Sequence, residues 1–169
     1  ECIQSLLDQD TKQIEIIISD NGSKDGSIDL LRKLFPSIKI IENKKNLGFG
    51  SAINRGLAIA SGDYLLFLNS DLKLDSKCIG ELTKLLERDS NIGGVIPKIL
   101  YIDRENTINS LGVLINYTGI AYPNLLGQQD PNWMEPFESA CGGIFMLRRE
   151  VYETVGGFDE NLFLYHEDH

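Results

Sequence analysis

The chain has 169 residues, 42% of them hydrophobic, so we expect one domain with a sizeable buried core. Its 16 basic and 25 acidic residues give a net charge of -9, which would repel a phosphate backbone and argues against nucleic acid as a partner. The three cysteines lie far apart and fit no zinc or redox spacing, which indicates a reducing compartment. No apolar run reaches the roughly 18 to 20 residues of a membrane span.

The chain opens with a helical pattern. Ile3, Leu6 and Leu7 recur at helical spacing, so the chain is expected to start inside a helix. The first residue is Glu1 rather than Met, and the sequence ends abruptly at Glu167-Asp168-His169. We therefore expect both ends to be cuts in a longer protein.

Strand and helix patterns then alternate through the first half. Apolar, β-branched runs predict three buried strands, at residues 14–19, 38–41 and 64–68. A helical pattern follows each of them, and Asp25 or Ser27 is expected to cap the first of these helices. Gly62 is expected to end the second. Three strand–helix repeats predict an α/β fold with a mostly parallel sheet covered by helices on both faces.

The second half has a different pattern. Strands are predicted at residues 95–101, 108–115 and 139–147, without a long helix between the first two. Residues 116–138 hold three of the five prolines and are interpreted as an irregular functional loop. A short helix is predicted at 150–155, ended by the two glycines that follow it.

Polar residues directly follow two of the predicted strands. Residues 20–25 read Asp-Asn-Gly-Ser-Lys-Asp, and residues 69–71 read Asn-Ser-Asp. Open parallel sheets bind ligands outside the carboxyl ends of their strands, so Asp20 and Asp71 are expected to approach one crevice. Taken alone, each of these segments is also an ordinary turn with a helix cap, and the glycine-rich loop 46–50 is also an ordinary tight turn.

The motifs in their order along the chain resemble those of the inverting glycosyltransferases of family 2, which have the GT-A fold. The matching segments are Asp20–Ser27, Asn46–Gly50, Asn69–Asp71, Gly142–Phe145, Gly156–Glu160 and Glu167-Asp168. They span nearly the whole chain, and the likeness is strongest to the rhamnosyltransferase-like branch that builds bacterial surface polysaccharides. Two departures are that the family's opening strand is missing and that Asn69 occupies the first position of its Asp-x-Asp metal motif.

The resemblance implies roles for individual residues. Asp71 would bind a divalent metal, Mn²⁺ or Mg²⁺, because hard cations prefer carboxylate oxygens and the leaving diphosphate develops negative charge. Asp168 would be the base that deprotonates the acceptor hydroxyl, with Glu167 as the second member of the catalytic pair. Asp20 would accept a hydrogen bond from the nucleobase edge. The residues implied in binding the nucleotide-sugar are Asp20, Asn21, Ser23, Asp25, Asn46, Gly48, Asn69, Gly142 and Gly143.

Other interpretations of the C-terminal motifs stay open. The glycines at 142 and 143 fit a strand with a bulge as well as a site that leaves room for a sugar ring. The acidic pair at 167 and 168 also fits an exposed pair of charges. His166 and His169 flank that pair, but two histidines without a fixed ligand set are more typical of a surface than of a zinc site.

The predicted organisation is a single glycosyltransferase domain fragment over residues 1–169, with a nucleotide-binding half at 1–90 and an acceptor or catalytic half at 91–169. The predicted function is metal-dependent, inverting transfer of a sugar from a nucleotide-diphosphate donor to a saccharide or lipid-linked acceptor, in surface polysaccharide synthesis. We expect a cytoplasmic protein that associates peripherally with the inner face of a membrane. The alternatives are a nucleotidyltransferase acting on sugar phosphates and a non-catalytic domain that retains the fold.

Overall fold

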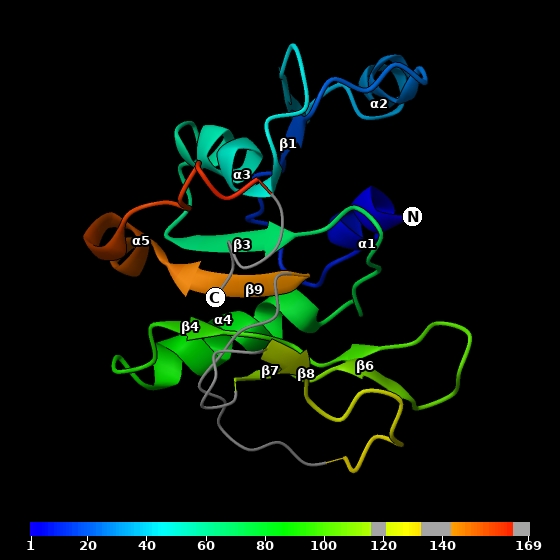
Figure 1. Cartoon of the computed structure of the whole chain (residues 1–169), viewed down its shortest axis with the longest axis vertical. Helices are drawn as coiled ribbons and strands as arrows, with labels where there is room; N and C mark the ends of the chain where they lie inside the picture. Colours follow the sequence, from blue (N-terminus) through cyan, green and yellow to red (C-terminus); the bar gives the residue numbers. More distant parts are fainter. Residues whose placement is uncertain (116–120, 133–142, 164–169) are drawn as a thin grey trace. The chain divides into compact units, whose positions relative to one another are not determined.

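The computed structural model of the chain (Figure 1) describes residues 1–115, 121–132 and 143–163. The helices are α1 (Cys2–Leu7), α2 (Ser27–Leu34), α3 (Phe49–Leu57), α4 (Cys78–Arg88) and α5 (Arg149–Val155). The strands are β1 (Ile17–Asp20), β2 (Lys39–Glu42), β3 (Tyr64–Leu68), β4 (Gly94–Val95), β5 (Ile99–Leu100), β6 (Ile108–Ser110), β7 (Val113–Ile115), β8 (Ala121–Pro123) and β9 (Ile144–Arg148). Within the described ranges, no helix has the length and apolar character needed to cross a membrane.

The described residues form two compact units. The β1–β2 unit holds residues 12–65 and the described residues from 148 onward, and the β3–β9 unit holds the described residues of 1–11 and 66–147. The chain passes from one unit to the other within β3 and again at the end of β9. The two units are groups of residues that contact one another, whereas the predicted halves at 1–90 and 91–169 were assigned to donor binding and to the acceptor or catalysis. The units therefore do not test the predicted halves, which stay a prediction.

The β1–β2 unit is built on two parallel strands. Ile17 lies opposite Lys39 and Asp20 opposite Glu42, with α2 as the crossover between the strands. Helix α3 packs on β1 and buries Ala52 and Leu57 (Figure 1). The strand predicted at 14–19 is observed at Ile17–Asp20, and Glu15, just before it, binds the side chains of Lys39 and Ser61.

Two helix ends in this unit were predicted, and both predictions need correction. The N-cap of α2 is Gly26, with a φ of 83° and no side-chain cap hydrogen bond, rather than Asp25 or Ser27. Asp25 Oδ1 accepts a hydrogen bond from Ser27 N at 3.0 Å, which closes a turn just before the helix. Helix α3 ends at Leu57, well before Gly62. The backbone N–H groups of Ala58, Ile59 and Ala60 bind the last carbonyls of the helix, so no glycine is needed there. The Arg149 guanidinium binds the carbonyls of Ala60 and Gly62, at 3.1 and 2.7 Å, in the connection that follows.

The β3–β9 unit contains a three-stranded sheet in the order β3-β9-β4. β4 pairs with β9 in the antiparallel sense, so the predicted parallel pairing holds for β1 and β2 but not for this ladder. In the core of the unit, the rings of Phe67 and Phe145 stack with centroids 4.4 Å apart. Leu86 on α4 and Ile108 on β6 are fully buried.

A buried glutamine joins α1 to the start of α4. Gln9 is 0% exposed, and its Nε2 donates to the carbonyls of Ser5 and Asp75 at 2.9 and 2.7 Å. Its Oε1 accepts from Ile79 N at 2.9 Å. Each such bond contributes about 0.5–1.5 kcal/mol, and losing the whole side chain would leave buried backbone groups unpaired.

Several strand predictions in the second half need correction. The strand predicted at 95–101 divides into β4 and β5 around Pro97, which has no N–H to donate to a ladder. The strand predicted at 108–115 divides into β6 and β7 at Gly112, which has a φ of 76°. The segment predicted to be irregular contains β8, which pairs with β7. Helix α5 and its end at Gly156, with a φ of 88°, are confirmed.

Candidate functional site

Asp20 closes β1 and organises the turn that follows. It is 9% exposed, and its Oδ2 accepts hydrogen bonds from Gly22 N at 2.9 Å and Ser23 N at 3.0 Å. No described residue donates a hydrogen bond to its other oxygen, Oδ1. Oδ2 therefore stabilises the turn, which is the structural interpretation given above for residues 20–25. Oδ1 remains able to accept a hydrogen bond from another donor.

Asn21 joins this turn to the loop before α3. Its Nδ2 donates to Gly48 O at 3.0 Å, and its Oδ1 accepts from Asn43 Nδ2 at 3.1 Å and from Leu47 N at 3.4 Å. The exposed side chain of Asn46 closes the same loop, since its Oδ1 accepts from Gly48 N at 2.9 Å. The ends of β1 and β2 and this loop therefore form one connected set, called here the strand-end network: Asp20, Asn21, Asn43, Asn46 and Gly48.

Sequence reasoning missed Asn43. It is 3% exposed, its backbone N donates to Asp20 O at 2.8 Å, and its Nδ2 also donates to Ser19 Oγ at 3.2 Å. Its Oδ1 is buried and has no hydrogen-bond partner among the described residues. An unpaired buried acceptor costs about 1–3 kcal/mol, so this oxygen marks a place where a donor belongs. The signal was weaker than at Asp20 and Asn69, because Asn43 lies two residues after the strand predicted at 38–41 rather than directly after it.

Two further predicted binding residues of this unit lie on the surface. Ser23 and Asp25 are exposed. The pKa of Asp25 is lowered, first by a hydrogen bond with the Ser27 hydroxyl and then by the Ser27 backbone N–H. Asp25 is thus engaged in the turn that leads into α2, which is the structural alternative for this residue.

The end of β3 brings together Asn69 and Gly143 in the β3–β9 unit. Asn69 N donates to Gly143 O at 2.9 Å, and Asn69 O lies 3.7 Å from the sulfur of Cys2. A Cβ on Gly143 would lie 3.3 Å from the side chain of Ile99 and 3.7 Å from that of Leu72. The expectation that this glycine leaves room for a sugar ring stays a prediction. Asp71 is exposed and forms no ion pair with a described cation. Burial raises the pKa of the Cys2 thiol, and the Asp71 charge nearby adds to that rise.

The chemistry of Asp71 fits one ligand of a divalent cation. A carboxylate at the end of a strand, exposed and unpaired with any described cation, offers the hard oxygen that such ions prefer. Among residues 1–115, 121–132 and 143–163, no group of three His, Cys, Asp or Glu side chains could hold a metal by itself. Further ligands would have to come from bound phosphate, from water or from residues outside these ranges.

Three predicted site residues, Gly142, Glu167 and Asp168, lie outside the described residues. The same holds for both histidines. Asp20 belongs to the β1–β2 unit and Asp71 to the β3–β9 unit, so the crevice predicted between them stays a prediction.

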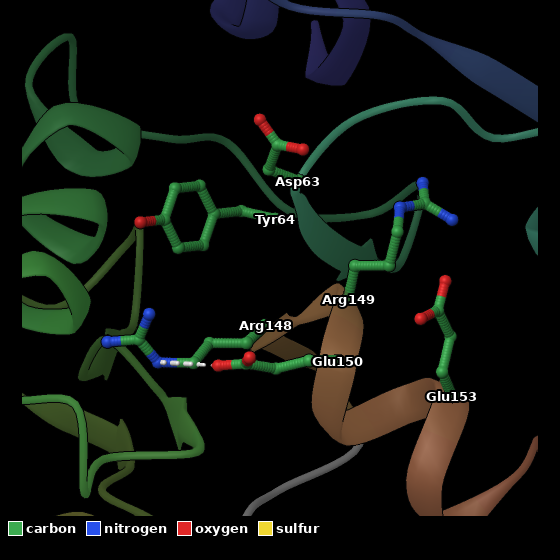
Figure 2. A pocket seen from close by; sticks show the side chains of 6 residues that line it. All are labelled: Asp63, Tyr64, Arg148, Arg149, Glu150 and Glu153. Carbon is green, nitrogen blue, oxygen red and sulfur yellow. Dashed lines mark ion pairs between the residues drawn. The ribbon is translucent and has the colours of Figure 1, made fainter.

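A cavity of about 320 Å³ lies elsewhere in the β1–β2 unit, at the start of β3 and the end of β9 (Figure 2). Its lining residues are Asp63, Tyr64, Arg148, Arg149, Glu150 and Glu153. Arg148 pairs with Glu150 at 3.9 Å, and Arg149 binds backbone carbonyls. None of the predicted site residues lines this cavity, so it is not the candidate site.

Comparison with known proteins places this geometry in a family. The sequence profile described as Glycosyl transferase family 2 matches residues 1–156. The O-antigen biosynthesis protein RfbC of Myxococcus xanthus is 29% identical over 156 residues, covering 86% of this chain and 12% of that protein. The N-acetylglucosaminyl-diphospho-decaprenol L-rhamnosyltransferase of Mycobacterium tuberculosis is 25% identical over 182 residues, covering 93% of this chain and 59% of the relative. The chain therefore spans only part of the length of these relatives.

The fold has solved counterparts. The crystal structure of GalNAc-T7 with UDP, GalNAc and Mn²⁺ matches with a TM-score of 0.73 at 19% identity, covering 97% of this chain and 34% of that one. This likeness confirms the predicted α/β class and GT-A fold. The rhamnosyltransferase-like branch that the motifs resemble is also the one found among the relatives. The chain belongs to glycosyl transferase family 2.

Proposed function

We propose that this chain carries the donor-binding and catalytic core of a glycosyltransferase that transfers a sugar, with inversion, from a nucleotide-diphosphate donor to a saccharide or lipid-linked acceptor. Family membership supports sugar transfer over nucleotidyl transfer. The M. tuberculosis relative, whose name specifies a diphospho-decaprenol substrate, supports the lipid-linked acceptor and surface polysaccharide synthesis. Such an acceptor would place the enzyme in the cytoplasm, at the inner face of a membrane.

The observation that carries the proposal is the strand-end network. Asp20 and Asn43 are held at the carboxyl ends of two parallel strands, where ligands bind in open sheets. Asp20 keeps one oxygen that accepts no hydrogen bond from a described residue, because its two described donors both bind Oδ2. That oxygen is an acceptor, and the N–H groups of a nucleobase edge are donors. Asn43, which is buried, holds Asp20 and Asn21 in place. The hydrogen bonds made by Asn21 hold this arrangement before any ligand arrives, which reduces the entropy that binding must overcome.

Asp71 supplies the second part of the donor site. Its exposed carboxylate would hold the divalent cation that stabilises negative charge on the leaving diphosphate. Asn69 precedes it by two residues, and an amide oxygen there adds a ligand without adding charge. The solved counterpart contains UDP and Mn²⁺, which supports a divalent metal for this chain.

The acceptor step is assigned to the acidic pair that the sequence predicts. Asp168 would take the proton from the acceptor hydroxyl as that oxygen attacks the anomeric carbon, and Glu167 would orient the acceptor or the base. Attack on the face opposite the leaving diphosphate inverts the configuration at that carbon. A non-catalytic domain would bind the donor but would not carry out this step.

The test uses the full-length protein that contains this chain. Thermal shift against a panel of nucleoside diphosphates, with Mn²⁺, with Mg²⁺ and without metal, would identify the base and the metal dependence. Product analysis with the matching nucleotide-sugar and a polyprenyl-diphosphate-linked saccharide would then measure transfer and the anomeric configuration. We expect metal-dependent binding of one nucleotide and an inverted product. Donor binding without transfer to any acceptor would favour the non-catalytic alternative.

A further inference from the structure

Asn54, in the middle of α3, binds both backbone polar groups of Phe158. Its Oδ1 accepts from Phe158 N at 2.9 Å, and its Nδ2 donates to Phe158 O at 2.9 Å. The same Nδ2 lies 3.1 Å from Glu160 Oε1. A carboxamide is the side-chain group that offers an acceptor and a two-hydrogen donor side by side, so it can match the N–H and C=O of one residue. Two parts of the chain 104 residues apart are thereby joined within the β1–β2 unit.

Glycines on both sides make this contact possible. A Cβ on Gly157 would lie 2.4 Å from Asn54 Oδ1, and a Cβ on Gly50 would lie 2.8 Å from Phe158 Cβ. A Cβ on Gly48 would lie 2.6 Å from Phe163 O. The sequence motifs at 46–50 and 156–160 therefore meet at one contact. This contact, called here the α3 joint, consists of Gly48, Gly50, Asn54, Gly157, Phe158 and Phe163.

The α3 joint lies between two functional segments. On one side, Gly48 is bound by Asn21 and belongs to the strand-end network. On the other side, the chain continues from Phe163 towards Asp168. Asp168 is five positions after Phe163, so covalent geometry alone keeps the Cα atoms of the two residues within about 18 Å of each other. The α3 joint thus fixes the point from which the segment bearing the acidic pair departs, relative to the loop of the donor site.

We propose that Asn54 is a positioning residue for sugar transfer, which acts by holding the backbone of Phe158 on α3. The proposal rests on the function proposed above. Asn54 itself contacts neither donor nor acceptor and takes part in no bond change. Its effect is on geometry, and a displacement of about 1 Å in a reacting group can cost roughly 10²-fold in rate.

The first test is Asn54→Ala in the full-length protein. We expect kcat for transfer to fall roughly 10- to 100-fold, while the Kd for the nucleoside diphosphate with Mn²⁺ stays within about threefold of wild type. The matched control is Arg149→Met, which removes two hydrogen bonds to the backbone between α3 and β3 in the same unit but leaves the α3 joint intact. Its kcat should stay within about threefold of wild type at a similar loss of thermal stability.

A second variant keeps the experiment informative if the alanine variant unfolds. Asn54→Asp preserves the size and the acceptor for Phe158 N but loses the donor and faces the Glu160 carboxylate, so transfer should again fall. Adding Glu160→Gln returns a donor to this contact and removes the repulsion. The double variant should therefore recover at least about threefold in kcat over Asn54→Asp.

The outcomes separate this inference from the proposed function. Transfer within threefold of wild type in both Asn54 variants would overturn the inference and leave the proposed function standing. An equal loss of kcat in Arg149→Met would also overturn it, because Asn54 would then act only through stability. If the wild-type protein transfers no sugar, both proposals fail together.

Discussion

The ends of β1 and β3 carry similar polar sequences but use them in different ways. At the end of β1, Asp20 is nearly buried, and one of its oxygens is bound by two backbone N–H groups. At the end of β3, Asp71 is exposed and pairs with no described cation. The first carboxylate is part of the fold as well as a candidate ligand for the base. The second forms no hydrogen bond or ion pair with a described residue, so it is available as a ligand without cost to the fold.

This difference decides what a mutation at each strand end can show. Removing Asp71 should affect ligand binding alone, whereas removing Asp20 should affect both folding and binding. Two further variants frame this comparison. Asp168→Asn, outside the described residues, should have the largest effect, and Glu15→Gln, just before β1, should have the smallest.

The largest effect is expected for Asp168→Asn in the full-length protein. The substitution keeps size and hydrogen-bonding ability but removes the basicity that deprotonates an acceptor hydroxyl. Transfer should fall by roughly 10² to 10⁴, while both strand ends still bind nucleotide and metal. Product formation and nucleotide titration would be measured together. Transfer within tenfold of wild type would remove Asp168 from the mechanism, and lost nucleotide affinity would assign it to the donor site instead.

Asp71→Ala should come next. In the presence of Mn²⁺, nucleotide affinity should fall by at least the roughly 10- to 100-fold that a lost contact around a metal costs. The midpoint of thermal unfolding should not change, because Asp71 makes no described stabilising contact. Asp103→Ala, another exposed carboxylate of the β3–β9 unit, is the control and should leave both quantities unchanged. Unaltered affinity with Mn²⁺ in the Asp71 variant would contradict its role as a ligand.

Asp20→Ala should show the mixed behaviour that distinguishes β1 from β3. Two backbone N–H groups lose their acceptor, so the free energy of unfolding should fall by about 1–3 kcal/mol. Donor affinity should weaken, with little change in turnover at saturation, because the base lies far from the reacting carbon. Urea denaturation and steady-state kinetics would separate the two effects. A large loss of turnover at unchanged affinity would show that Asp20 acts at the reacting end of the donor.

The smallest effect is expected at the opposite end of β1, for Glu15→Gln. Hydrogen bonds with Lys39 and Ser61, chiefly the bond with Lys39, lower the pKa of Glu15 to about 2 from 4.5. Because the folded pKa is depressed, the stabilisation is present above about pH 4.5 and is lost as the pH falls towards 2. At pH 7 the variant should lose less than about 1 kcal/mol, as expected for an ion pair near the surface. Urea denaturation at the two pH values should show that wild type and variant differ less in free energy of unfolding at pH 3 than at pH 7. An equal difference at both pH values would mean that the charge of Glu15 does not contribute to stability.

Local patterns in the sequence predicted where the strands end but not which strands and side chains pair with each other. The apolar runs that become β1 and β3 were sufficient to place Asp20 and Asn69 at carboxyl ends, because strand burial leaves a direct hydrophobic signal. Strand partners leave no such signal, and β3 pairs with β9 rather than extending the β1–β2 ladder. The partners of Asn54 were equally hidden, since a contact across 104 residues has no local pattern.

Errors at element ends have local causes. Gly62 does not end α3, because the backbone N–H groups of residues 58–60 already bind the last carbonyls of the helix. The strand predicted at 95–101 is interrupted at Pro97, which has no N–H for a ladder. Asn43 was missed although it follows a strand, because no recognised motif contained it.

The α3 joint also has a consequence for how the protein is made. Helix α3 leaves the ribosome long before its partners, since Phe158 lies 104 residues after Asn54 and Arg149 lies 87 residues after Gly62. At roughly 5–20 residues per second, the helix waits about 5 to 20 s for the segment that covers it. Contacts between residues so far apart in sequence also form slowly, because a long loop must close first. We therefore expect the side of α3 that carries Gly50 and Asn54 to stay uncovered during synthesis and to be covered only after α5 and Phe158 have emerged.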